Sequence, residues 1–129
     1  MLVKALQLGA DVGLGRIIEQ TADETPDQVF ESLAAGRMQL WAVSENGRPI
    51  ASMITQIERR PAAGVLSVRY LAGTGMERWA PAASEALRAF AREVGCGAIE
   101  AVGREGLRKH LLALGWFKVA VLYRMPADG

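Results

Sequence analysis

Apolar residues in the middle of the chain fall into three short segments that are separated by turn-forming residues. Segments 38–44 and 49–58 flank the dipeptide Asn46-Gly47, which favours a tight hairpin turn. Segment 65–71 alternates apolar and polar residues and follows a second turn at 60–64, which contains Pro61 and Gly64. The pattern therefore predicts three antiparallel strands that follow one another as a meander.

A first amphipathic helix is predicted immediately before these strands. Thr25 has the properties of an N-cap, because a proline follows it and a glutamine lies three residues further on, at position 28. Val29, Phe30 and Leu33 would form the apolar face of this helix. Gly36 is placed to end it in a left-handed conformation.

A second amphipathic helix is predicted directly after Gly75. It has apolar residues at three- and four-residue spacing on the side expected to pack on the sheet, namely Trp79, Ala83, Leu87, Phe90 and Val94. Gly95 would end it. The rest of the chain predicts a short buried strand at 98–102, a helix at 104–114 capped by Gly115, and a last strand at 116–125.

The order of these elements predicts one α+β domain over residues 1–129, with a mixed, mainly antiparallel sheet and helices on both faces. No repeat or low-complexity tract divides the chain. The first 24 residues carry the weakest pattern, and residues 1–8 fit a strand or a helix equally well.

Composition narrows the class of protein. Half of the 129 residues are hydrophobic, enough for a packed core without a disulfide or a metal. The single cysteine, Cys96, excludes a disulfide framework and suits a reducing compartment. The opening residues lack the features of a secretory signal or a membrane span, so we expect a cytoplasmic protein without membrane contact. Fifteen basic and fourteen acidic residues argue against a dedicated nucleic-acid-binding protein.

The third strand leads into Gly73-Thr74-Gly75, and the second amphipathic helix follows at once. This arrangement brings backbone N–H groups without helical partners to a helix N-terminus, which is a general solution for binding a phosphate. An ordinary strand-to-helix turn is the alternative, because a Gly-x-Gly turn alone is a weak signal.

The element order and this turn resemble the GNAT superfamily of N-acetyltransferases over residues 25–125. The family turn reads Gln/Arg-x-x-Gly-x-Gly/Ala, and both of its glycines match here, while Tyr70 takes the leading position. The resemblance implies acetyl-CoA as the cofactor, with its pyrophosphate on the backbone of the turn. The residues implied are Leu71, Ala72, Gly73, Thr74, Gly75 and Met76.

The C-terminal half resembles the family segment Asn-x-x-Ala-x-x-Leu-Tyr-x-x-x-Gly-Phe. Counted back from Gly115, the tyrosine that commonly protonates the leaving CoA thiolate falls at Leu111, and Arg104 stands where the asparagine usually lies. Leucine cannot donate a proton, so the usual acid is missing. Arg104 and Arg108 are candidates for binding the 3′-phosphate of CoA, with a solvated helix face as the alternative.

Two residues are candidates for the catalytic groups. Glu58, at the end of the second predicted strand, would deprotonate the amine, unless it is a surface glutamate paired with Arg59 or Arg60. Tyr123, on the last predicted strand, would replace the missing acid, unless it serves only in packing. The sequence predicts no metal site.

A narrower resemblance is to small GNAT-like proteins of bacteriophages and prophages, and it leaves two functions open. Its carriers are the segments 36–41, 71–73, 91–96 and 103–106. The first function is an acyl-CoA-dependent N-acetyltransferase acting on a primary amine. The second is a catalytically inactive virion component or interaction module whose partner is a phage or host protein.

Overall fold

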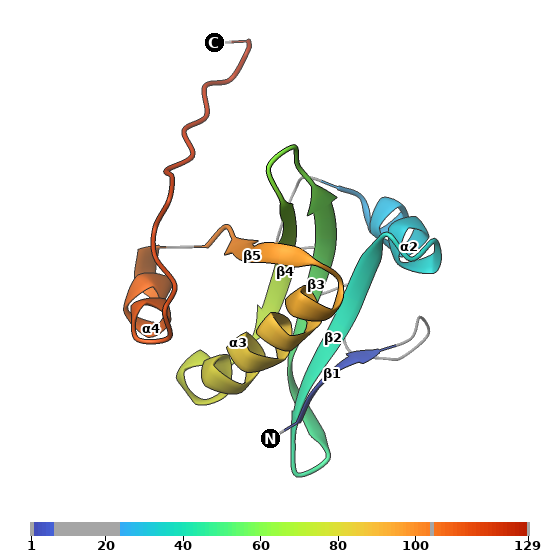
Figure 1. The fold of residues 1–129 in the computed structure, drawn as a ribbon, viewed down its shortest axis with the longest axis vertical. Coiled ribbons are helices and arrows are strands. Elements are labelled where there is room, and N and C mark those ends of the chain that lie inside the picture. The colour runs from blue at the N-terminus through green and yellow to red at the C-terminus, as the bar shows by residue number, and fades with distance from the viewer. Residues whose placement is uncertain (1, 7–23, 104, 129) are drawn as a thin grey trace.

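A computed structural model describes residues 2–6, 24–103 and 105–128. Its strands form one sheet in the order β1-β2-β3-β4-β5, in which β4 and β5 are parallel and the other neighbours are antiparallel (Figure 1). The elements are β1 (Leu2–Leu6), α2 (Pro26–Ala34), β2 (Met38–Glu45), β3 (Arg48–Arg59), β4 (Gly64–Gly73), α3 (Met76–Glu93), β5 (Cys96–Ala101), a 3-10 helix (Glu105–Leu107) and α4 (Arg108–Leu112). The predicted mixed, mainly antiparallel α+β fold is confirmed.

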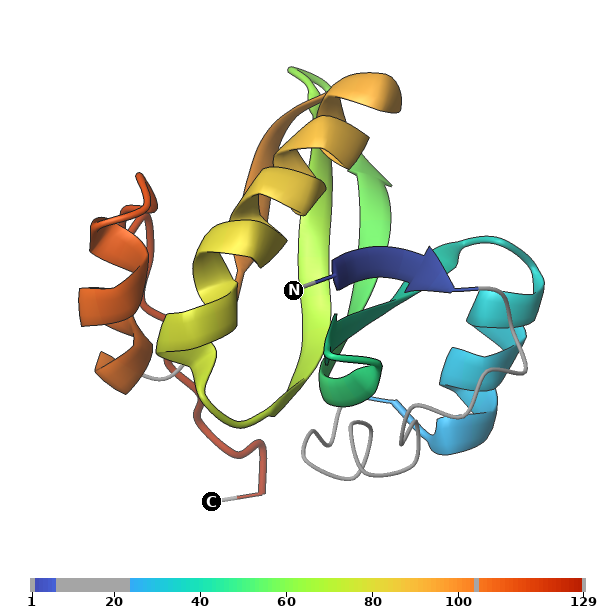
Figure 2. The same ribbon diagram turned by 90° about the horizontal axis from the view of Figure 1, so that it is seen from below.

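Helices cover both faces of the sheet, as predicted, and each face has its own apolar core (Figure 2). On one face α3 contributes Trp79 and Leu87, which pack with Trp41 and Leu66 of the strands. On the other face α2 contributes Val29 and Leu33, which pack with a group of strand residues: Met38, Leu40, Ile54 and Tyr70. The sheet is thus a central layer between two unequal helical layers.

Local signals set the boundaries of α2. The Thr25 side chain accepts a hydrogen bond from the backbone N–H of Gln28, and the Gln28 side chain accepts one from the N–H of Thr25, which completes the predicted capping box. Gly36 has φ +77° and ends the helix as expected. Phe30 is a correction, because its side chain is 50% exposed. It lies one residue, about 100° of helix, away from the buried Val29 and so points off the sheet.

The C-terminal part differs most from the prediction. Segment 98–102 was expected to be a buried strand, but β5 ends at Ala101 and is largely exposed, because among the described strands it has a neighbour on one side only. The helix expected at 104–114 is shorter, comprising the 3-10 helix and α4. No strand is assigned at 116–125, where the chain has no strand partner among the described residues. Residues 2–6 form a strand, which decides between the two alternatives left open there.

None of the helices described here is long and apolar enough to cross a membrane.

Candidate functional site

The turn between β4 and α3 stands at the N-terminus of an 18-residue helix. Gly75 is the N-cap, with φ +68°, and no side chain of the described residues caps the helix. The indole Nε1 of Trp79 donates a hydrogen bond to the carbonyl oxygen of Thr74 at 3.0 Å, which ties the turn to the helix behind it. The first N–H groups of a helix lack helical partners and favour an anion. The exposed carboxylate of Glu77 lies in the same first turn and would oppose an anion placed beside it.

The second feature is a strand that has a partner along only half of one edge. β4 pairs with β3 along its whole length, from Gly64 to Gly73, but it pairs with β5 only from Gly64 to Val68. Among the described strands, the last five residues of β4 therefore have a strand partner on one side only. This open edge of β4 ends at the Thr74–Gly75 turn, so it adjoins the N-terminus of α3.

A bulge marks the beginning of the open edge. Val68 lies opposite Thr55, and Tyr70 lies opposite the next residue, Ile54, so that Arg69 is the extra residue. Because of the bulge, Arg69 and Tyr70 both point toward the face of the sheet that α2 covers. Tyr70 packs in the core on that face, and the Arg69 guanidinium lies over the Tyr70 ring. A bulge re-aims side chains and backbone groups, and such irregularities are common beside active sites.

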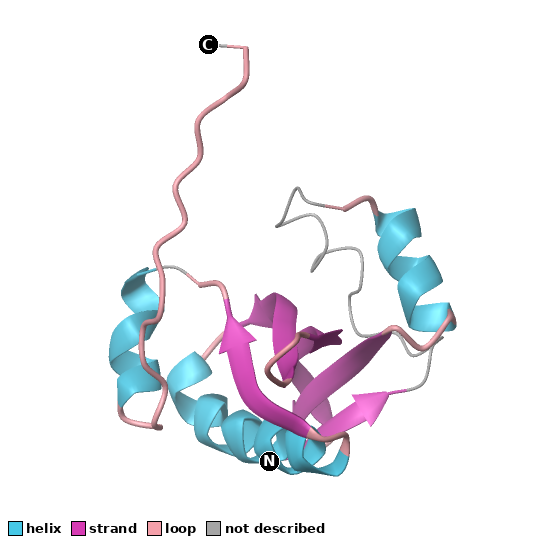
Figure 3. Ribbon diagram, turned by 45° about the horizontal axis from the view of Figure 1, so that its top comes forward, coloured by secondary structure: helices cyan, strands magenta, loops and turns pink. Residues whose placement is uncertain are grey.

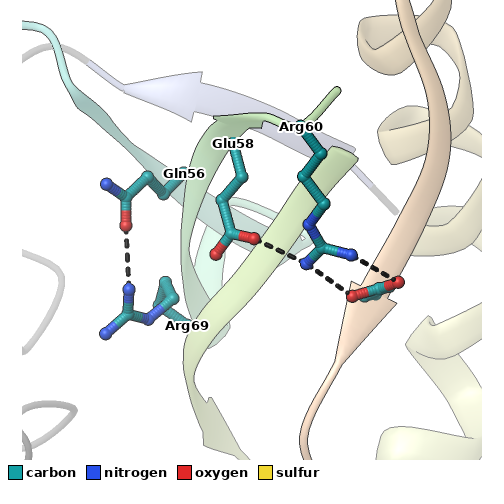
Figure 4. Close-up of polar contacts among 5 residues, drawn as sticks. Gln56, Glu58, Arg60 and Arg69 are labelled. Atoms are coloured by element: carbon teal, nitrogen blue, oxygen red, sulfur yellow. Dashed lines mark hydrogen bonds and ion pairs between the residues drawn. The ribbon is translucent and has the colours of Figure 1, made fainter. Parts of the chain in front are cut away.

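Glu24 joins the two re-aimed side chains. Its Oε1 accepts a hydrogen bond from the Tyr70 hydroxyl at 2.5 Å and another from Arg69 Nη2 at 3.2 Å. Arg69 Nη1 also donates to Gln56 Oε1 at 2.9 Å (Figure 4). The Glu24 side chain is 22% exposed, so a half-buried carboxylate stands beside the bulge with its position fixed by two donors.

A second polar group lies further along the same face, toward the other end of β3. Arg60 stands between two carboxylates, and its Nη2 lies 2.6 Å from Glu58 Oε2 and 2.9 Å from Glu100 Oε1 (Figure 4). Hydrogen bonds from Arg60 lower the pKa of the Glu100 carboxyl. The pKa of Arg60 is raised, most by its hydrogen bond to Glu100 and next by its hydrogen bond to Glu58. The group therefore carries a net negative charge at neutral pH.

We expect Arg60→Gln to raise the pKa of Glu100 toward its ordinary value, because the bonds that hold the charged form are lost. Since the folded-state pKa is lowered, this pair stabilises the protein above the ordinary carboxyl pKa and ceases to do so as the pH falls through the lowered value. A titration of the Glu100 carboxyl carbon by NMR checks the shift, with Arg59→Gln as the neighbouring control. An unchanged Glu100 pKa in Arg60→Gln would contradict this assignment.

A shallow pocket of about 240 Å³ lies between the first turns of α3 and the helix α4. Glu77, Ala80 and Pro81 line it from α3, and Lys109 and His110 contribute cationic or polar groups from α4. Because it adjoins the same helix N-terminus as the open edge of β4, the pocket extends the candidate site toward α4.

The structure distributes the sequence-predicted phosphate residues over three elements. Leu71, Ala72 and Gly73 are the last residues of β4, paired with Met53, Ser52 and Ala51 of β3, and only Thr74 and Gly75 form the turn. Met76 is the first residue of α3. The phosphate-binding segment predicted at 71–76 therefore consists of the end of a strand, a two-residue turn and the start of a helix.

Of the other predicted site residues, the structure places Glu58 and Tyr123 away from this turn. Arg108 begins α4, and Arg104 lies outside the described residues. Glu58 pairs with Val65, eight positions from Gly73 along β4. At about 3.3 Å per residue this is roughly 26 Å from the turn. Tyr123 is 87% exposed on the C-terminal segment that follows α4.

Sequence reasoning missed Glu24, Gln56 and Arg69. One signal was available for the bulge, because the apolar residues that face α3 run Leu66, Val68 and then Leu71, which breaks the two-residue period. No local signal joins Glu24 to Tyr70, since 46 residues separate them. In the described residues no cluster of three or more His, Cys, Asp or Glu side chains could hold a metal ion.

No protein-family model matches the sequence, and a search of curated proteins gives no match. Solved structures do match over nearly the whole chain. A probable acetyltransferase superimposes with a TM-score of 0.76 at 11% identity, covering 98% of this chain and 97% of the other.

Two further similar structures are N-acetyltransferases with known acceptors in their names. Glucosamine-6-phosphate N-acetyltransferase from Arabidopsis thaliana has a TM-score of 0.67 at 13% identity, covering 99% of this chain and 100% of its own. An aminoglycoside 6′-N-acetyltransferase from Acinetobacter haemolyticus has a TM-score of 0.66 at 12% identity, covering 98% and 97%. At these identities the likeness shows the fold alone. The chain therefore has the GNAT fold that its sequence resemblance implied.

Proposed function

We propose that the protein binds an acyl-CoA, acetyl-CoA first of all, and transfers the acyl group to a primary amine. The observation that carries this proposal is the open edge of β4, which begins at a bulge and ends at an uncapped helix N-terminus. Such an edge can pair with the amide groups of a pantetheine chain, and the helix N-terminus can receive the pyrophosphate.

The residues present fit such a ligand. A Cβ built on Gly75 meets nothing nearer than Arg78 Cδ at 3.8 Å, so the turn leaves room for a phosphate close to the backbone. Lys109 and His110, in the pocket between α3 and α4, are candidate partners for further phosphate charge. Arg108, at the start of α4, and Arg104, from its place in the sequence, are candidates too. Bound acetyl-CoA would supply the activated thioester.

The reaction needs a base for the incoming ammonium group and donors for the carbonyl oxygen. We assign the base to Glu24, because its carboxylate stands beside the bulge, where Arg69 and Tyr70 hold it, whereas Glu58 lies further from the turn. Glu24 first takes a proton from the ammonium group, because only the neutral amine has a lone pair for attack. The amine nitrogen then forms a bond to the acyl carbon as the carbon–sulfur bond breaks. The second proton that leaves the nitrogen passes through water to the thiolate, since Leu111 offers none. Backbone N–H groups at the bulge would hold the carbonyl oxygen.

The acceptor class that we propose is a small amine with hydroxyl groups, such as an amino sugar or an aminoglycoside. Two structurally similar enzymes act on glucosamine 6-phosphate and on aminoglycosides. The face beside the bulge offers Gln56 for hydroxyl groups, and the net negative Glu58–Arg60–Glu100 group attracts a cationic amine.

Titration with acetyl-CoA by calorimetry tests the binding step. We expect micromolar affinity, and we expect Gly75→Asp to weaken it at least tenfold, because a carboxylate at the turn repels the pyrophosphate. Gly75→Asn is the matched control, since asparagine has the same shape and also tolerates a positive φ. Equal affinity for the two variants, or no heat with the native protein at millimolar acetyl-CoA, would overturn the proposal.

Release of the CoA thiol in the presence of amino sugars tests the chemical step. Glu24→Gln should lower turnover at least a hundredfold while it leaves the acetyl-CoA affinity within about twofold. Glu58→Gln is the comparison, and a larger loss there would transfer the role of base to Glu58.

A second candidate function is a non-catalytic interaction protein of bacteriophage, acting within a virion or on a host protein. The leucine at position 111 favours it, because the usual acid of the resembled family is lost there. Absence of acetyl-CoA binding in the calorimetry would favour this function over the enzyme.

A further inference from the structure

At one end of the sheet, β3 extends past its neighbour β2. The pairing of β2 with β3 begins at Met38, which lies opposite Gln56, whereas β3 continues to Arg59 and pairs there with β4. Among the described strands, residues 57–59 of β3 therefore have a strand partner on one side only. The space beside them, which β2 does not fill, is called the notch below.

A pocket of about 280 Å³ occupies the notch. Its volume is close to the lower end of the range for ligand sites, so it suits a small molecule. None of its described lining residues is an Asp or a Glu, and two of them are arginines. The lining residues are Gly36, Arg37, Gln39, Gln56, Ile57 and Arg59. The pocket is therefore positively charged.

A buried chain of hydrogen bonds orients one of the lining side chains, Gln39. Trp41 Nε1 donates to Thr55 Oγ1 at 2.9 Å, and the Thr55 hydroxyl donates to Gln39 Oε1 at 2.8 Å. An indole N–H can only donate, so the Thr55 hydroxyl accepts from Trp41 and gives its own proton to Gln39. Thr55 is 0% exposed and Trp41 is 4% exposed, so the chain has no competition from bulk water. The Gln39 oxygen is thereby held inward, and the NH2 group remains as a donor.

The two arginines belong to the same face of the sheet as Gln39. Arg37 and Gln39 are two positions apart, as are Ile57 and Arg59, and residues two apart in an extended chain share a face. Ile57 packs in the core under α3, so this is the face that lies away from α2 (Figure 3). Arg59 Nη2 donates to the carbonyl oxygen of Val94 at 3.4 Å, which keeps Arg59 beside the C-terminal end of α3.

Neither Arg37 nor Arg59 has a carboxylate partner among the described residues. Four other arginines each form an ion pair with a glutamate, namely Arg60, Arg69, Arg78 and Arg88. Guanidinium groups bind oxyanions through charge-assisted hydrogen bonds. Two arginines without a counter-ion at one pocket, beside an amide held as a donor, therefore form a site that lacks only its anion.

We propose that the notch binds a phosphate group, either free or carried by a small phosphorylated molecule. Its donors come from both strands, which suits the several oxygens of a tetrahedral anion better than the two coplanar oxygens of a carboxylate. Ile57 pairs with Leu66, seven positions from Gly73 along β4. At about 3.3 Å per residue the notch is roughly 23 Å from the turn between β4 and α3. The proposal is therefore independent of acyl-CoA binding.

The indole N–H signals in an NMR spectrum report which of the two sites is occupied. Trp41 is connected to the notch through Thr55 and Gln39, whereas Trp79 is connected to the β4–α3 turn through Thr74. Inorganic phosphate should shift the Trp41 signal with a Kd on the order of 1 mM and leave the Trp79 signal in place. Absence of a saturable Trp41 shift up to about 50 mM phosphate would overturn the proposal.

Gln39→Glu is the most specific variant for this site. A glutamate can still accept the hydrogen bond from Thr55, but it replaces the amide donor with a negative charge. We expect the phosphate affinity to fall by about tenfold or more. The Trp41 signal without phosphate shows whether the buried chain is intact in the variant. An intact variant with unchanged phosphate affinity would contradict the assignment.

A pair of arginine variants separates the notch from general surface charge. Arg37→Gln removes a charge at the pocket, and Arg48→Gln removes the same charge at the other end of β3. We expect about a tenfold loss of phosphate affinity in the first variant and a change within about twofold in the second. Equal losses in the two variants would overturn the proposal.

The nature of the anion is tested by comparing malonate, inorganic phosphate and glucose 6-phosphate. We expect both phosphate compounds to bind more tightly than malonate, and the tighter of the two shows whether the phosphate is free or esterified. Tighter binding of malonate would contradict the assignment to phosphate.

Discussion

Replacement of Gly73 by alanine is expected to lower the free energy of unfolding by about 3 kcal/mol. A Cβ at Gly73 would lie 2.5 Å from the Cβ of Ala51, 2.8 Å from its Cα and 2.8 Å from the carbonyl oxygen of Ile50. The backbone of Gly73 also has φ +151°, which side chains rarely tolerate. Crowding against the β3 backbone and dihedral strain therefore both lower the free energy of unfolding. Urea denaturation measures the combined decrease.

Gly36→Ala is the matched control for this effect. Gly36 also has a positive φ, +77°, but a Cβ there meets nothing within 4 Å. We expect a loss of only about 1 kcal/mol, from backbone strain alone. Equal losses at the two positions would show that contact with Ala51 does not matter. Because the fold itself requires Gly73, a variant at Gly75 is the better test of ligand binding.

Trp79→Ala is expected to lower the free energy of unfolding by about 4 kcal/mol, which makes it the other large effect. The side chain is 2% exposed and packs in the core between α3 and the sheet, so its removal leaves a cavity. Removal of the indole also leaves the carbonyl oxygen of Thr74 without the hydrogen bond that it accepts from Trp79 Nε1. Thermal and chemical denaturation should agree on the size of the effect.

Trp79→Phe separates the two contributions. Phenylalanine keeps most of the apolar volume but has no N–H group, so we expect a loss of about 1–2 kcal/mol together with weaker acetyl-CoA binding. A phenylalanine variant as unstable as the alanine variant would mean that packing is the smaller contribution.

The sequence predicted the part of the fold that local signals specify. The capping box at Thr25 and Gln28, the Asn46-Gly47 turn and the apolar spacing of α3 each depend on residues within a few positions, and all three predictions were confirmed. The last strand was predicted wrongly for a physical reason. Alternation at 116–125 shows that one face is apolar, but a strand exists only where a partner lies beside it, and that partner is not a local property.

The candidate site followed the same division. The Gly-x-Gly turn was visible in the sequence because strand, glycines and helix are contiguous there. The carboxylate beside the bulge could not be predicted from the sequence, since Glu24 reaches Tyr70 only after α2 and the sheet have formed. Glu58 looked suitable because it lies near the end of its strand. The strand register, however, pairs it with Val65, at the end of β4 that is far from the turn.

The half-paired β4 has a consequence for the thermodynamics of binding. The backbone from Arg69 to Gly73 is held from behind by β3, so its conformational entropy is already lost when the chain folds. A ligand that pairs with the open edge would bind to a preorganised backbone. Little conformational entropy of the protein would then be lost on binding. Most of the entropy given up on binding would then belong to the ligand, and stiffening a flexible ligand should strengthen its binding more than stiffening the protein.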